Sequence, residues 1–321
     1  MYWRPGIQRQ NSHSLLTWYT PREIGEVLFN WRTIIAAIAI SAISLPVFAQ
    51  RPDLPVNVLV RRVVNNELAA ANNKTHRFMF RSHRVTGNLD QEKLYVDTKE
   101  AMAGMVTAWN SQPLTPELRK AENDRLNRML SDPEELRHKQ KQERENADRI
   151  QRIIRAMPDA FLFEYDGTET GTASVGHPGM ELIRVKFRPN PNYEPPSRVE
   201  QVLTGMQGTV LVDPKSARFA RIDGTLFRDV AFGWGILGHL DKGGQLRAEQ
   251  VEYSPGIWVP SSMSLRFTGK LLLFKSLNYK SEESFRDFRP VPSDLTFAQG
   301  IELLKKENSA VAQNLPAKTG S

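Results

Sequence analysis

Residues 208–228 read Gly-Thr-Val-Leu-Val-Asp-Pro-Lys-Ser-Ala-Arg-Phe-Ala-Arg-Ile-Asp-Gly-Thr-Leu-Phe-Arg, and this stretch decides the fold. It begins with an apolar run that Pro214 ends, because proline has no backbone N–H to donate to a strand ladder. The residues after 218 alternate in polarity, which is typical of a strand with one buried face. The residues expected on the apolar side are Ala220, Ile222, Gly224 and Leu226. Two strands joined by a short turn predict an antiparallel hairpin.

The same pattern recurs along most of the chain. Further strands are predicted over 77–85, 92–98, 104–110, 161–165, 181–188, 246–253, 258–273 and 275–288. Because short turns separate most of them, the sequence predicts an antiparallel meander within an α+β fold. A long curved sheet of this kind, an unclosed half-barrel, must cover its apolar concave face with other elements.

Helices are predicted in two places that suit this covering role, with a further short one over 297–306. Residues 54–75 carry apolar side chains near a 3.6-residue period, which indicates an amphipathic helix. Residues 114–157 form an insertion that we expect to be a charged helical hairpin, with capping signals at Thr115 and at 131–134. Its stretch 137–149 is nearly all charged or amide, and it is either a solvated helix face or a partner-binding arm. The residues after it with helical spacing, which we expect to dock on the core, are Ile150, Ile153, Ile154 and Met157.

The N-terminal region resembles an export signal. An apolar core over 34–45 follows Arg32, and Val47 and Ala49 place small residues at −3 and −1 of a cleavage site. We therefore expect residues 1–49 to be a signal peptide and the mature protein to be periplasmic. The alternative is an uncleaved segment that anchors the protein in the inner membrane.

Composition excludes several classes of protein. The chain has no cysteine, so it has no disulfide, no lipidated cysteine and no thiolate ligand. Residues 1–49 hold four arginines and two glutamates, so their removal lowers the formal charge from +7 to +5. That mild excess is compatible with a membrane surface, but the chain carries no nucleic-acid-binding motif.

Motifs for cofactor binding, metal binding and catalysis are also missing from the sequence. Residues 233–238 match G-x-G-x-x-G, but the glycine-rich turn at 241–244 follows where a helix would have to begin, so no dinucleotide site is expected. The histidines lack metal-ligand spacing, and no nucleophile elbow or phosphate loop is present. We expect a protein that is not an enzyme and has no catalytic residues, cofactor or metal.

Large apolar side chains gather instead in the C-terminal strands. They predict either a plain hydrophobic core or an apolar cavity for an acyl chain. The expected cavity residues are Leu226, Trp258, Leu265, Phe267 and Leu271, with Trp234 and Leu237 at the rim.

Several short motifs carry a resemblance to a known family. They are Gly208-Thr-Val-Leu-Val-Asp-Pro214, Arg218-Phe-Ala-Arg-Ile-Asp223, Trp258-Val-Pro260 and a last strand that ends in Phe288-Arg289. With the export signal and the opening helix, they resemble the LolA/LolB-like superfamily of periplasmic lipoprotein carriers, which includes RseB-type lipid sensors. The resemblance covers roughly 55–110 and 160–290. It implies an unclosed β-barrel with helices as a lid over a cavity that receives acyl chains.

Two features depart from that family. The segment 115–157 is not part of the usual carrier, and no lipidated cysteine of the LolB kind exists. We expect a single domain over 50–305 with a polar tail over 306–321. The expected function is binding of a lipid, an acyl chain or a lipidated partner, and the alternative is an envelope interaction or sensor protein that acts through the charged insertion.

Overall fold

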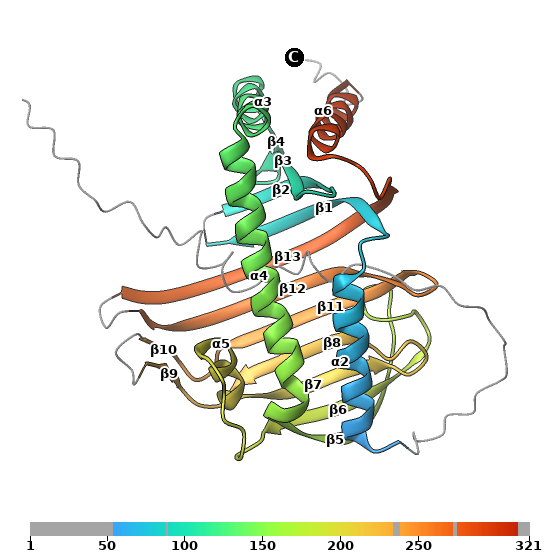
Figure 1. The fold of residues 1–321 in the computed structure, drawn as a ribbon, viewed down its shortest axis with the longest axis vertical. Helices are drawn as coiled ribbons and strands as arrows, with labels where there is room; N and C mark the ends of the chain where they lie inside the picture. Colours follow the sequence, from blue (N-terminus) through green and yellow to red (C-terminus); the bar gives the residue numbers. More distant parts are fainter. Residues whose placement is uncertain (1–53, 88, 234–237, 272–274, 314–321) are drawn as a thin grey trace, which may run out of the picture.

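The computed structural model describes residues 54–87, 89–233, 238–271 and 275–313. The signal-peptide prediction over 1–49 lies outside these residues. The chain is α+β and its sheet is one large antiparallel layer (Figure 1). The helical elements are α2 (Val56–Asn72), α3 (Pro116–Ser131), α4 (Pro133–Ala160), α5 (Arg198–Gln201), the 3₁₀ turn η2 (Val202–Gly205) and α6 (Phe297–Gln313).

The sheet consists of two antiparallel runs in sequence order, one from each side of α3 and α4. The first strand pairs with the last, whereas a single meander would leave these two strands at opposite edges. The strand order is β4-β3-β2-β1-β13-β12-β11-β8-β7-β6-β5, and β10 joins β12 and β9 at the side. Every ladder between these strands is antiparallel, and within the described residues β4 and β5 at the two ends are not paired with each other. The sheet is therefore not closed. The strands are β1 (Arg77–Thr86), β2 (Leu89–Asp97), β3 (Met102–Trp109), β4 (Gln112–Pro113), β5 (Phe161–Thr170), β6 (Glu181–Pro189), β7 (Met206–Asp213), β8 (Arg218–Leu226), β9 (Val230–Phe232), β10 (Gly238–Leu240), β11 (Gln245–Ser254), β12 (Ile257–Leu271) and β13 (Lys275–Val291).

Two helices pack onto one face of this sheet. Figure 1 shows α2 and α4 side by side across the strands β5–β8 and β11. Both contribute to the largest apolar cluster, α2 through Val60 and Val63 and α4 through Ile150 and Ile154. The predicted docking of the last turns of α4 is confirmed, because Ile150, Ile154 and Met157 are buried and Ile153 packs against the same cluster.

A second apolar cluster lies at the other end of the molecule. There α3 and α6 pack against β1–β3 through Leu126, Ile301 and Leu304. The helix α6 reaches Gln313, seven residues beyond the predicted end at 306. This extension includes the strong helix formers Glu307, Ala310, Ala312 and Gln313.

Side chains from α3 and α4 satisfy backbone groups of β3 that lie beyond its pairing with the two-residue edge strand β4. The Glu122 carboxylate accepts the Val106 N–H at 2.7 Å, and Arg125 donates to the Gly104 carbonyl at 2.7 Å. The Glu143 carboxylate of α4 accepts the Met102 N–H at 3.1 Å. These contacts protect an edge that could otherwise pair with another chain. They also place part of the charged stretch 137–149 against the sheet rather than wholly in solvent.

No helix within the described ranges is long and apolar enough to cross a membrane.

Candidate functional site

The apolar cluster beneath α2 and α4 brings together three of the predicted cavity residues. Leu226 of β8 and both Leu265 and Phe267 of β12 are buried in it, with exposed fractions of 0%, 1% and 7%. Their strands are two apart in the sheet, and β11 between them adds Leu246 and Ala248 to the same cluster. The alternating pattern therefore placed these three side chains correctly. It was wrong for Ala220 of β8, which packs in a separate small cluster because the β7–β8 register shifts between Phe219 and Arg221.

The structure places Trp258 elsewhere. It belongs to a small separate cluster with Val175, Leu182, Leu211 and Ala220. Leu182 and Leu211 alternate with Ile183 and Val212, which pack in the large cluster, so the small cluster lies on the other face of β6 and β7.

The reason is an interruption of the sheet beside β8. The β8–β11 ladder ends at Arg221–Glu249, and beyond it the loop residue Gly176 donates to the Gln250 carbonyl at 2.8 Å. Trp258 packs against this loop, under the Arg218 guanidinium at 5.9 Å from the ring centroid. Trp258 is therefore not part of the large apolar cluster.

The predicted cavity residue Leu271 lies at the end of a strand. Leu271 is the last residue of β12, and its backbone pairs with Gly238 of β10 and Lys275 of β13. The predicted rim residues Trp234 and Leu237 lie outside the described residues.

The large cluster is closely packed. A Cβ added at Gly244 would lie 2.6 Å from Cδ1 of Phe267 and 3.0 Å from Cδ1 of Leu226, so only glycine fits beside these two side chains. Because Leu226 and Leu265 are almost fully buried, no acyl chain can reach them while α2 and α4 stay in place.

A buried ion pair fastens α2 to the sheet. The Glu67 carboxylate accepts from Nε and Nη2 of Arg218 at 2.8 and 2.9 Å, from the Phe219 N–H at 2.9 Å and from Nε2 of Gln250 at 3.0 Å. Both charged side chains are under one tenth exposed. Sequence reasoning missed this pair, although Glu67 stands in the apolar stripe of its helix and so occupies a core position.

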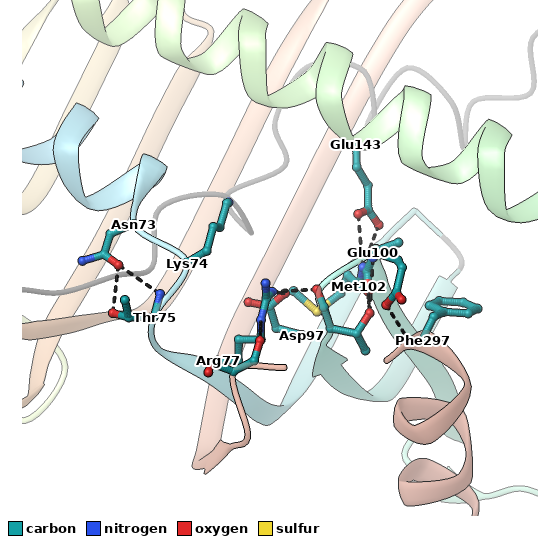
Figure 2. Close-up of polar contacts among 12 residues, drawn as sticks. Asn73, Lys74, Thr75, Arg77, Asp97, Glu100, Met102, Glu143 and Phe297 are labelled. Atoms are coloured by element: carbon teal, nitrogen blue, oxygen red, sulfur yellow. Dashed lines mark hydrogen bonds and ion pairs between the residues drawn. The ribbon is translucent and has the colours of Figure 1, made fainter. Parts of the chain in front are cut away.

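A second polar group lies where β1, β2, α4 and α6 meet. Figure 2 shows Arg77 reaching Asp97, with Nη1 to Oδ1 at 3.0 Å and Nη1 to the Thr98 carbonyl at 2.6 Å. Glu100 accepts the N–H of Phe297, which begins α6, at 2.8 Å. Burial raises the pKa of Asp97, and the attraction of Arg77 and Lys74 only partly offsets this. These bonds join the start of β1 and the start of α6 to the end of β2 and the residues after it.

An open cleft of about 500 Å³ runs along α4. Unlike the apolar cavity that the sequence predicts, its lining is charged: Glu145, Asp148, Arg149, Gln151, Arg152 and Arg155. Arg152 lies 3.9 Å from the nearly buried carboxylate of Glu200 on α5. The cleft therefore suits polar or charged groups, not an acyl chain.

Within the described part of the chain, no three histidine, cysteine, aspartate or glutamate side chains converge on a point that could hold a metal ion.

No family model, no curated protein and no solved structure matches this chain.

Proposed function

We propose that this protein binds an acyl chain, as a lipid or as a lipidated partner, between the inner face of its sheet and the helices α2 and α4, without catalysing a reaction. One observation carries the proposal: a large apolar sheet face is covered by two helices, while the sheet itself stays open. A helix can leave the face of a sheet without breaking any strand ladder.

The energies of lid opening and ligand binding are of similar size. Moving α4 away exposes Ile150, Ile154 and Met157 to solvent. Each of these side chains then loses about 1.5–3 kcal/mol of the free energy that its burial contributes. A chain of twelve methylene groups gains about 0.8 kcal/mol for each group that it buries, or about 10 kcal/mol. An acyl chain can therefore replace the helix on the sheet without a large net cost.

The ion pair between α2 and α4 is compatible with opening. Arg61 of α2 and Asp159 of α4 form an ion pair at 2.6 Å, but both side chains are more than half exposed. Exposed pairs of this kind contribute little to stability. By contrast, the buried Glu67–Arg218 pair holds α2. We therefore expect α4 to be the element that moves.

The proposed compartment is the periplasm, reached through the signal sequence of residues 1–49. There the ligand would be a lipid or a lipidated protein of the envelope, and the mildly basic mature chain would tolerate an anionic membrane surface. The resemblance to lipoprotein carriers supports the same proposal.

A titration with a fluorescent fatty acid tests this function. Phe267→Ala removes an apolar contact on the inner face, and Arg266→Ala changes the exposed neighbour on the other face of β12. We expect the first variant to weaken binding several-fold and the second to bind as the wild type does, with both folded by circular dichroism. Absence of binding by the wild type, or equal weakening by both folded variants, would refute acyl-chain binding.

A second function is favoured by the charged cleft on α4. An envelope interaction or sensor protein would present Arg149, Arg152 and Arg155 to an acidic partner. Loss of a specific partner on replacing Arg155, with fatty-acid binding absent from the wild type, would favour this alternative.

A further inference from the structure

The inner face of the sheet carries a buried carboxylate beside its apolar cluster. Along β13, Leu277 and Tyr279 belong to that cluster, and Ser281 and Glu283 follow on the same face. The Glu283 side chain is only 2% exposed. It accepts from Nε and Nη2 of Arg84 at 2.9 and 2.6 Å, and the Ser82 hydroxyl also donates to it.

The strand register extends this pair into a polar row. Glu283 lies opposite Met263 of β12 on one side and Arg84 of β1 on the other, and Arg84 lies opposite Gln91 of β2. Directly opposite residues of an antiparallel pair point to the same face. Met263 packs in the large apolar cluster, so the row Glu283–Arg84–Gln91 begins where that cluster ends. Thr86 and Ser281, bonded at 3.0 Å, flank the row.

Gln91 is the unusual member of this row. Its side chain is nearly completely buried, and Nε2 has no hydrogen-bond partner among the described residues. A buried amide donor without a partner costs free energy, and native proteins seldom retain one without a reason. A group of a bound molecule that accepts a hydrogen bond would remove this cost.

We infer that the row Glu283–Arg84–Gln91 binds the uncharged polar end of an amphiphile whose acyl chain lies on the neighbouring apolar cluster. The inference rests on the function proposed above and names the class of ligand. An ester or amide carbonyl accepts from Nε2 of Gln91, and a hydroxyl donates to the carboxylate of Glu283.

The charge of the row explains the preference for an uncharged group. Nε and Nη2 of Arg84 both bond the Glu283 carboxylate, so the pair has no net charge to attract an anion. A free carboxylate or phosphate would be repelled by Glu283 and would lose much of its hydration. A glycerol ester or a fatty amide avoids both penalties.

Displacement of a fluorescent fatty-acid probe by two competitors of equal chain length tests the inference. The competitors are 1-monomyristoylglycerol, which is uncharged, and myristate. We expect the wild type to bind the monoglyceride at least five-fold more tightly. Gln91→Leu should lose most of that preference by weakening the monoglyceride about five- to ten-fold, with myristate unchanged. Gln207→Leu, an exposed control on β7, should behave as the wild type.

The outcomes separate this inference from the proposed function. If the wild type binds neither the probe nor the competitors, acyl-chain binding itself is refuted and the inference falls with it. If both competitors bind equally, or if Gln91→Leu keeps the wild-type preference, acyl-chain binding stands and the polar row is only structural. Should Gln91→Leu fail to fold, Gln91→Met, which has similar length and no amide, takes its place.

Discussion

At the scale of single residues, burial competes with neighbouring charges in setting the pKa of a carboxyl group. Asp97 illustrates this, because it contacts the Arg77 guanidinium and still has a raised pKa. The desolvation of the carboxylate outweighs the attraction of nearby cations. Glu67 and Glu283 each accept several hydrogen bonds within the core.

The raised pKa of Asp97 predicts a pH dependence of stability. A carboxyl group whose pKa is higher in the folded than in the unfolded protein stabilises the fold below its unfolded value, near 3.8, and loses that contribution as the pH rises through the folded value. Asp97→Asn keeps an oxygen to accept from Arg77 and does not ionise. We expect the variant to gain stability relative to the wild type between pH 4 and pH 7, measured by urea denaturation at several pH values.

An exposed substitution, Asp294→Asn, provides the control for general charge effects. If the stability difference between Asp97→Asn and the wild type is the same at pH 4 and pH 7, Asp97 does not titrate as proposed.

At the scale of elements, α4 combines two kinds of surface. Its first half carries the charged stretch, in which Glu143 still reaches the sheet, and its second half carries the apolar stripe. A helix with one buried stripe owes most of its stability to tertiary packing. The charged cleft and the apolar contact thus lie on different faces of one helix.

Two substitutions in the last turns of α4 test whether the helix is stabilised by its apolar stripe and not by its charged face. Ile154→Ala removes a buried side chain and should lower the free energy of unfolding by about 2–4 kcal/mol. The neighbouring exposed Arg155→Ala should change it by less than about 0.5 kcal/mol. The free energies come from urea denaturation followed by far-ultraviolet circular dichroism. Similar losses for both variants would mean that α4 does not dock through its apolar stripe.

At the scale of the whole molecule, the sheet is continuous although its strands come from both ends of the described chain. The ladder between β1 and β13 joins the strands before the α3–α4 insertion to those after it. Polar contacts such as Arg77 to the Ser293 carbonyl at 2.7 Å hold the same two regions together. The strands before α3 and those after α4 therefore belong to one sheet.

Export of the whole protein can be checked directly. The full-length chain, expressed in a bacterium with an envelope, should be cleaved after Ala49, so that the mature N-terminus is Gln50. Intact mass and N-terminal sequencing of the protein from the periplasmic fraction measure this. An intact N-terminus on membrane-bound protein would instead indicate an uncleaved anchor.

The sequence by itself determined most of the local structure. Polarity patterns located the ten longer strands but not β4, β9 and β10, which have only two or three residues each. The 3.6-residue stripes located α2 and the docking turns of α4, because these periods depend only on local backbone geometry. The placement of Leu226, Leu265 and Phe267 on one apolar face followed from two-residue alternation.

Only the tertiary structure decided which distant residues meet. Glu67 and Arg218 are 151 positions apart, and Glu283 bonds Arg84 across 199 positions, so no local period could pair them. The placement of Trp258 depended on where the β8–β11 ladder ends and on the loop at Gly176. Local rules fix which side chains share a face, whereas strand order, register and the point at which a ladder stops depend on packing across the whole sheet.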